Sequence, residues 1–198
     1  MAKNMQPVLK RCRTLGVSPA AMGYNKSSNK NPGGQRRAKK SEYATQLTEK
    51  QKVKFVYGIQ EKQFRNYYEK ASRMEGNTGE ELLTFCERRL DNVVYRLGFA
   101  MSRAEARQMV THGHITVNGR KVNIPSYQVK PGMVIALKES SRGIEKIKSN
   151  IEANAFRPAP KWLEYDANSF AGKVVAVPAR DDIDLPIEEH LIVELYSK

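Results

Sequence analysis

The residues of this sequence best suited to chemistry are basic side chains, and the chemistry they support is the binding of phosphate. Arg103 and Arg107 lie four residues apart, so on a helix they would share one face. A guanidinium group donates a fork of hydrogen bonds that fits phosphate oxygens. Arg88, Arg89 and Arg96 come shortly before this pair. We therefore predict a surface that binds the backbone of a nucleic acid, with an ordinary solvated helix face as the alternative.

The densest basic cluster is the segment 35–41, which contains Arg36, Arg37, Lys39 and Lys40. The first 54 residues hold thirteen basic and two acidic side chains, and so carry +11 of the chain's formal charge of +13. Most of this stretch is poor in large apolar residues, so it cannot offset the entropy that ordering would cost. We predict that residues 1–45 form a disordered basic arm that orders on RNA, with a solubilising or targeting tail as the alternative.

The candidate RNA-binding residues form two groups, and each combines cations with side chains that can stack on a base or form hydrogen bonds. The group in the arm and the following helix comprises Arg36, Arg37, Lys39, Lys40, Ser41, Tyr43, Gln46, Lys50, Lys52 and Lys54. The second group comprises Arg88, Arg89, Arg96, Arg103, Arg107, His112, His114, Asn118, Arg120 and Lys121. No Cys or acid near His112 and His114 completes a metal site, so we predict that they bind RNA or serve a helix end.

Composition narrows the class of function. A length of 198 residues allows one large domain or two small ones after the arm, and a pI near 9.8 favours a polyanionic partner. Two cysteines are too few for a disulfide framework, which is typical of a reducing cytosol. There is no apolar run of about 20 residues and no secretory signal. The sequence also lacks a nucleophile elbow, a P-loop and a pair of catalytic acids, so we predict no enzymatic activity and no cofactor.

Capping patterns predict the helices that must position these side chains. Three four-residue segments fit the capping box that starts a helix, and a glycine follows as the end of each helix. The predicted helices span 48–75, 78–97 and 103–111. The aromatic residues at helical spacing in the first of them are predicted to be core residues rather than base-stacking residues, and these are Tyr57, Phe64 and Tyr67.

After these helices the pattern changes to period two, which is typical of strands. Asn118-Gly119 predicts a type I′ hairpin, and Lys130-Pro131-Gly132 predicts a second turn. We expect strands over 133–137 and 174–177, a helix over 144–155 between them, and a short helix near the C-terminus.

Together these elements predict the α+β class. A disordered basic arm covers 1–45, and a mostly helical first domain covers 46–87 and is completed by the C-terminal tail 179–198. An RNA-binding domain covers 88–178, with short helices packed on a small, mainly antiparallel sheet.

Several stretches resemble the family of bacterial small-subunit ribosomal protein four. The string RRLDNVVYRLGFAMSRAEARQMVTHGHITVNGRKVNIPSYQVKPGMVIAL, Arg88 to Leu137, is similar to the αL-type RNA-binding domain of that family. The segments 39–71, 76–83 and 184–198 resemble its first helical domain, its connector and its C-terminus. The resemblance is weakest in the arm. It implies a structural protein of the small ribosomal subunit, located in the cytoplasm, that binds 16S rRNA directly and nucleates assembly of the subunit body.

The resemblance also implies partners other than rRNA. It places the protein near the channel through which mRNA enters, beside small-subunit ribosomal proteins five and three, with a contribution to translational accuracy. No membrane and no small-molecule substrate are expected. Acids near the C-terminus would be repelled by RNA, and the resemblance makes them contacts of protein five. These acids are Asp181, Asp182, Asp184, Glu188 and Glu189.

The sequence departs from one property of the family and leaves two alternatives open. Many members bind zinc through a cysteine cluster in the arm, but this arm has Cys12 alone, so no metal is expected. An RNA-modifying enzyme is one alternative, because Arg89-Leu90-Asp91 matches the string around the catalytic aspartate of RNA pseudouridine synthases. The chain outside the αL-type domain is too short for that catalytic domain. A standalone RNA chaperone is the other alternative, and it would need neither the helical domain nor the acidic tail.

Overall fold

The computed structural model describes residues 7–24, 26, 41–157, 159–166 and 169–197. The chain divides into two compact units, which are described here one at a time. The helical unit consists of Met1–Leu82 with Leu185–Lys198, and the sheet unit consists of Leu83–Asp184. The predicted boundary of an arm at residue 45 stays a prediction, because residues 27–40 lie outside the described part of the chain.

The helical unit is built around a long helix, α2, which begins six residues before its predicted start. Helix α2 spans Glu42–Tyr57, and its N-cap Ser41 accepts a hydrogen bond from the backbone N–H of Ala44. Thr48 lies inside the helix and donates to the carbonyl oxygen of Ala44 at 2.7 Å, so the predicted helix start at Thr48 is wrong. The helix begins after Ser41 rather than at Thr48, because the Ser41 hydroxyl oxygen accepts a hydrogen bond from a free N–H group of the first turn.

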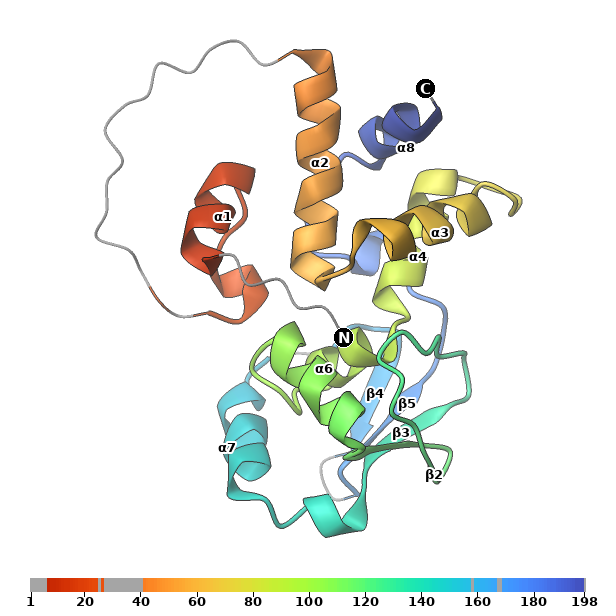
Figure 1. Ribbon diagram of the computed structural model, residues 1–198. Coiled ribbons are helices and arrows are strands. Elements are labelled where there is room, and N and C mark those ends of the chain that lie inside the picture. Colours follow the sequence, from red (N-terminus) through yellow and green to blue (C-terminus); the bar gives the residue numbers. More distant parts are fainter. Residues whose placement is uncertain (1–6, 25, 27–40, 158, 167–168, 198) are drawn as a thin grey trace. The chain divides into compact units, whose positions relative to one another are not determined.

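The predicted helix over 48–75 is in fact two helices. Gly58 adopts φ 62°, a left-handed conformation that ends α2, and α3 then spans Glu61–Ala71. The core prediction for the aromatic residues is confirmed, since Tyr57, Phe64 and Tyr67 are all buried. Helix α8, Glu189–Ser197, packs along α2 (Figure 1) and confirms the predicted C-terminal helix.

Part of the predicted arm is helical. Helix α1 spans Val8–Leu15, and the short 3-10 turn η1 spans Ala20–Met22. Cys12 and Leu15 of α1 are buried in a small apolar cluster with Phe55 of α2. The segment 8–15 therefore departs from the prediction of an arm without structure, because it carries enough apolar surface for one helix to pack.

The sheet unit begins within α4, which spans Thr78–Glu87, and continues with α5, Leu90–Arg96, and α6, Arg103–His112. The predicted single helix over 78–97 is wrong. The chain between α4 and α5 is extended: Arg89 pairs with Gln128 in a β-bridge, and the Leu90 N–H donates to the Tyr127 carbonyl at 2.9 Å. Ser102 is the N-cap of α6 as predicted, since its side chain accepts from the Glu105 N–H, but the Glu105 carboxylate accepts from the Met101 N–H rather than closing the predicted capping box.

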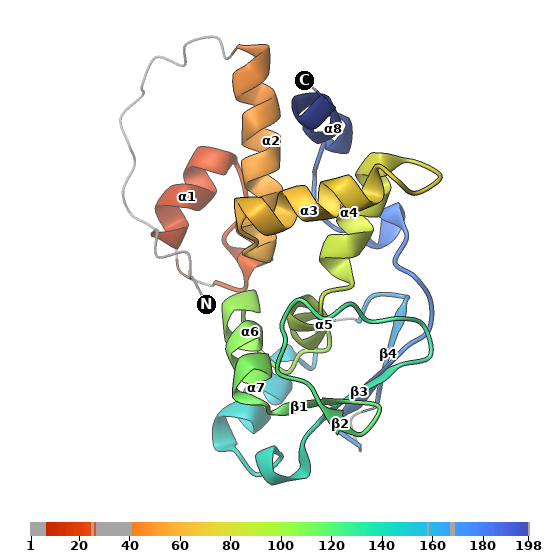
Figure 2. The ribbon, with the colours of Figure 1, turned by 45° about the vertical axis from the view of Figure 1, so that its right-hand side comes forward.

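The sheet is antiparallel throughout and runs in the order β2-β1-β3-β5-β4. Its strands are β1, Ile115–Val117, β2, Arg120–Lys121, β3, Val134–Leu137, β4, Leu163–Asp166, and β5, Ala171–Val174. The 3-10 turn η2, Glu139–Ser141, and helix α7, Glu145–Asn154, lie between β3 and β4, and the 3-10 turn η3, Arg180–Asp182, follows β5. Figure 2 shows α6 and α7 beside this sheet.

The hairpin turn agrees with its prediction, whereas the last two strands do not. Asn118 and Gly119 have φ values of 49° and 77°, the left-handed pair that a type I′ hairpin requires. The strand predicted over 174–177 is wrong in its bounds, since β5 ends at Val174. Strand β4 was not predicted.

The α+β class is confirmed. None of the helices in the described part of the chain combines the length and apolar character needed to cross a bilayer.

Candidate RNA-binding surface

Two of the predicted RNA-binding arginines converge on one buried carboxylate. Asp91, on α5, is 2% exposed. The Arg89 guanidinium donates to both of its oxygens, at 3.0 and 2.8 Å, and Arg107 of α6 donates through Nε at 2.8 Å and forms an ion pair at 2.7 Å. A buried carboxylate needs paired, hydrogen-bonded partners, and these two guanidiniums supply them.

A second buried acid, Glu87 at the end of α4, accepts hydrogen bonds from Arg96 and Asn92. Arg96 donates to it at 2.9 Å, and Asn92 donates at 2.6 Å. The Arg103 Nε in turn donates to Asn92 Oδ1 at 2.8 Å, and the Arg103 guanidinium lies 4.4 Å from the ring centroid of Tyr95. The arginine network therefore consists of Arg89, Arg96, Arg103 and Arg107 with Asp91, Glu87 and Asn92.

This network corrects the prediction that Arg103 and Arg107 share a solvent-exposed helix face. The spacing was right, but Arg103 is 7% exposed and Arg89 only 5% exposed, and both point into the protein. The reason is that α5 presents Asp91 and Asn92 to that face of α6. Arg88 is half-buried and donates to the Val129 carbonyl at 2.9 Å. RNA contact by these residues stays a prediction. In this structure their side chains form hydrogen bonds within the protein.

A different set of cations lies exposed where α6 ends and the first hairpin begins. We call His112, Arg120, Lys121 and Lys138 the hairpin cluster; all four are exposed. The Lys121 side chain lies directly against Gly113, where a larger residue would collide with it. In the described part of the chain, the lysines and Arg120 form no ion pair with a carboxylate. The hairpin cluster is therefore a basic surface whose charge is not neutralised by carboxylates of the described residues.

His114 lies beside the hairpin cluster, and its pKa is lowered from the ordinary value of a histidine. Burial lowers the pKa of His114, and the nearby His112, Lys138 and Lys121 lower it further. Its Nδ1 lies 2.9 Å from the Ser141 hydroxyl oxygen, which fixes the ring. Lys138 is a residue that sequence reasoning missed; the available signal was a lysine directly after the predicted strand 133–137.

Asn118, which is predicted to bind RNA, also has a structural role in the hairpin. Its side-chain oxygen accepts from the Val134 N–H at 2.8 Å while its backbone holds the left-handed turn. In the ranges that the structure describes, no three histidine, cysteine or acidic side chains gather as a metal site requires. Cys12 and Cys86 are both buried as free thiols.

The predicted contacts of the helical unit are mostly engaged within the protein. Gln46 is fully buried and donates to Glu42 and Glu194 at 3.1 and 3.0 Å, so its side chain forms hydrogen bonds within the protein and its RNA contact stays a prediction. Packing of α8 against α2 covers it. Lys52 pairs with Glu49 at 2.6 Å. Ser41 and Tyr43 remain exposed, and Tyr43 keeps 60% of its surface in solvent.

Lys50 and Lys54 converge on Glu61 of α3, at 3.0 and 2.6 Å. Tyr196 of α8 also donates to Glu61, at 2.7 Å. Burial alone would raise the pKa of Glu61, but the hydrogen bonds from Lys54, Tyr196 and Lys50 outweigh it and lower the pKa to about 2. These lysines therefore tie α2, α3 and α8 together. Arg36, Arg37, Lys39 and Lys40 lie outside the described residues.

The five acids predicted as one protein interface belong to two units. Asp181, Asp182 and Asp184 are in the sheet unit, whereas Glu188 and Glu189 are in the helical unit. Asp182 accepts from the Ala179 N–H at 3.0 Å, and Asp184 pairs with Arg96 at 3.2 Å.

Comparison with known proteins covers both units. The model of the ribosomal protein S4/S9 N-terminal domain matches residues 3–87, and the model of the S4 domain matches residues 88–135. The small ribosomal subunit protein uS4 of Agathobacter rectalis is 54% identical over 198 residues, which is 100% of both chains. The uS4 protein of Fusobacterium nucleatum is also 54% identical over 100% of both chains. That of Acetivibrio thermocellus is 59% identical over 95% of this chain and 88% of its own.

Proposed function

This chain belongs to the family of the small ribosomal subunit protein uS4, and from this premise we propose how it works within the small subunit. It is a structural ribosomal protein that binds rRNA, and it is not an enzyme. We propose that it binds small-subunit (16S) rRNA early, nucleates assembly of the subunit body, and lies beside the channel through which mRNA enters.

One observation carries the placement of the rRNA contact on the sheet unit. The arginine network is satisfied by Asp91 and Glu87, whereas Arg120, Lys121 and Lys138 of the hairpin cluster face solvent. An array of cations without internal partners is suited to phosphate, and its binding would release counterions from the RNA. Hairpin and helix-end backbone next to these cations adds hydrogen-bonding groups.

The standalone chaperone and the RNA-modifying enzyme are both disfavoured by the extent of similarity. Each alternative needs only an S4 domain from this chain, but the S4/S9 N-terminal model matches 3–87 as well, and relatives match over the full length. The Asp91 carboxylate, which the enzyme alternative would need as a catalyst, is buried between Arg89 and Arg107.

Binding of the full-length protein to a small-subunit rRNA fragment at several salt concentrations tests the proposal. The logarithm of the binding constant should fall with the logarithm of salt by about 0.7–0.9 per phosphate contacted. A large-subunit rRNA fragment of equal length is the control, and it should bind more weakly. A nearly flat salt dependence, or equal affinity for the two RNAs, would contradict the proposal.

We extend the proposal to neighbouring ribosomal proteins and to decoding accuracy. The arm residues Arg36, Arg37, Lys39 and Lys40 are proposed to approach mRNA, the acids after residue 180 are proposed to contact small-subunit protein five, and protein three is proposed as a further neighbour. Asp181 is exposed, so reversal of its charge removes a surface acid without uncovering the core.

The test of this extension is Asp181→Lys, with misreading measured by a reporter and rRNA affinity measured on the isolated protein. We expect changed misreading at unchanged affinity, because rim charges orient a protein contact without dominating its strength. Glu152→Gln, an exposed acid on α7, is the matched control. Normal accuracy in assembled subunits would remove the interface role.

A further inference from the structure

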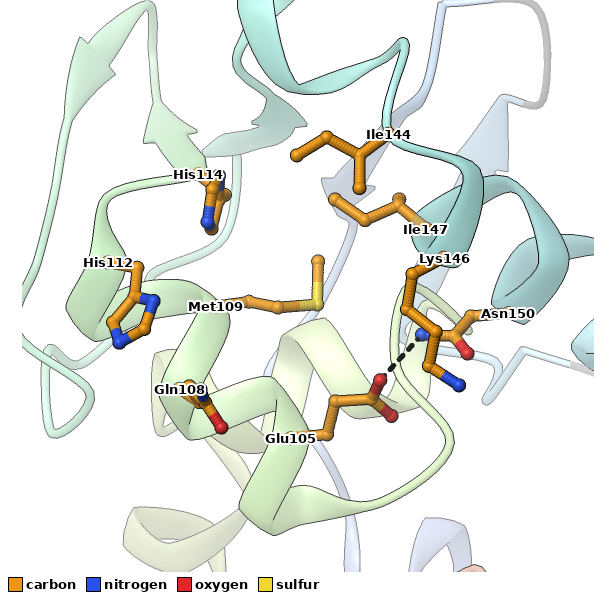
Figure 3. A pocket seen from close by; sticks show the side chains of 9 residues that line it. All are labelled: Glu105, Gln108, Met109, His112, His114, Ile144, Lys146, Ile147 and Asn150. Carbon is orange, nitrogen blue, oxygen red and sulfur yellow. Dashed lines mark hydrogen bonds between the residues drawn. The ribbon is translucent and has the colours of Figure 1, made fainter.

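A small pocket lies between α6 and the start of α7, next to the hairpin cluster (Figure 3). It has a volume of about 210 Å³, and its apolar side is formed by Met109, Ile144 and Ile147. In Figure 3 the Met109 side chain extends from α6 toward the two isoleucines. Ile144 and Ile147 lie beyond residue 135, where the S4 domain model ends, so one wall of this pocket comes from outside the matched domain.

The opposite side of the pocket is polar and held in place. Glu105 accepts from the Asn150 side chain at 2.9 Å through one oxygen and from the Met101 N–H at 2.8 Å through the other. A carboxylate has about four acceptor positions, so a fixed carboxylate of this kind can accept a further hydrogen bond from a ligand. Gln108 and Lys146 are exposed at the rim, and His112 lies nearby on the same helix as Gln108.

Size and chemistry together select the occupant. Drug-sized ligands occupy cavities of about 300–1,000 Å³, so a cavity of 210 Å³ suits a single flat ring system. An apolar wall opposite fixed polar groups can hold an unstacked base by contact with its ring and by hydrogen bonds to its edge. Lys146 supplies a positive charge at the rim that suits the phosphate such a base carries, and the His112 ring beside it can form a hydrogen bond. We propose that the pocket between α6 and α7 binds one unpaired RNA base that bears an exocyclic amino group.

The preference for an amino group follows from Glu105. Its carboxylate accepts hydrogen bonds and donates none, so it favours the amino groups of cytosine, adenine or guanine. Uracil flanks its ring N–H with two carbonyl oxygens, and these would meet the carboxylate unfavourably. The inference rests on the proposed function, since it names part of the RNA that the same protein would bind.

Titration of the full-length protein with AMP, CMP and UMP, followed by the NMR signal of the Met109 methyl group, tests the pocket. Met109→Leu assigns that signal. We expect AMP and CMP to shift it at lower concentration than UMP does. Lys146→Glu should weaken AMP binding about two- to fivefold, in line with the loss of one exposed charge contact. Lys148→Glu, an exposed lysine on the same helix that does not line the pocket, is the matched control and should leave binding unchanged.

A small-subunit rRNA fragment added to the same sample separates this inference from the proposed function. Binding of the fragment with a shift of the Met109 signal supports both. Binding without any shift at Met109, or equal responses to the three nucleotides, overturns the pocket and leaves the function standing. A shift with AMP but none with bound rRNA means that the pocket takes free nucleotide only, which also overturns the inference. Absence of rRNA binding itself would instead overturn the proposed function.

Discussion

The arginine network and the hairpin cluster use the same kind of side chain in opposite ways. In the network, Arg89 and Arg107 hold the buried carboxylate of Asp91. In the hairpin cluster, Arg120 and Lys138 extend into solvent without a protein carboxylate among the described residues. Charge content alone does not separate a binding surface from a structural one. The distinguishing property is whether the protein already supplies the opposite charge.

This difference has an energetic basis. Removing one partner of a buried ion pair leaves an uncompensated charge in a poorly solvated place, which costs much more than losing an exposed cation. An exposed cation is well solvated and contributes little to stability, so it remains available to a ligand. The two regions should therefore respond oppositely when stability and rRNA affinity are measured on the same variants.

The largest effect is expected for Asp91→Asn. The variant keeps the shape of the side chain but leaves Arg89 and Arg107 facing a neutral amide, so stability should fall by about 3–5 kcal/mol. Urea unfolding followed by circular dichroism measures the change. Glu152→Gln is the control and should stay within about 0.5 kcal/mol of the unmodified protein. A similarly small change for Asp91→Asn would mean that the network does not support the fold.

The double variant Arg120→Ala with Lys138→Ala should show the reverse pattern. Each lost contact to phosphate is expected to cost about 1.5 kcal/mol of binding, so rRNA affinity should drop by about 3 kcal/mol at low salt. Filter binding measures affinity, and unfolding of the same sample should be unchanged because both side chains are exposed. Lys161→Ala, another exposed lysine of the sheet unit, serves as the control. Equal losses for the control and the double variant would show that the hairpin cluster is not special.

A smaller effect is expected for Tyr95→Leu, which sharpens the description of the network. The ring of Tyr95 lies under the guanidiniums of Arg103 and Arg157, at 4.4 and 4.8 Å from its centroid. Loss of both cation–π contacts should destabilise the protein by about 1–2 kcal/mol. Tyr95→Phe keeps the ring and should behave like the unmodified protein. If both variants lose the same stability, the hydroxyl group rather than the ring matters.

The smallest effect concerns Glu61 in the helical unit and depends on pH. The pKa of Glu61 is lowered from 4.5 to about 2, so its ionised form stabilises the fold above pH 4.5. This contribution is lost as the pH falls from 4.5 toward 2. Glu61→Gln should therefore be less stable than the unmodified protein at pH 7, and the gap should close near pH 2. The gap should be below about 1 kcal/mol because the Glu61 side chain is 46% exposed.

Unfolding curves at pH 7, 4 and 2.5 for both proteins measure this gap. Glu80→Gln, which neutralises an exposed acid of the helical unit, is the control for general charge effects. A gap that is constant across these pH values would show that ionised Glu61 is not held by Lys50, Lys54 and Tyr196 as the structure indicates.

The sequence predicted the elements whose causes are local. Asn118-Gly119 formed the expected hairpin turn, Ser102 formed the expected cap of α6, and Gly113 ended that helix with φ 77°. The α+β class, the buried aromatic residues and the C-terminal helix followed from periodicity. Local patterns misplaced the start of α2 and missed the breaks at Gly58 and Arg89, because each break depends on what packs against the segment.

The sequence by itself determined that Arg103 and Arg107 lie on one helix face, because helical spacing is a property of the chain. Only the tertiary structure decided that this face turns inward, because Asp91 and Asn92 approach it from α5. The same holds for the pocket, whose walls come from Met109 on α6 and Ile147 on α7. Burial and charge pairing depend on residues distant in sequence. For that reason the basic segments could be located from the sequence, whereas the packing of the chain decides which of their side chains remain exposed.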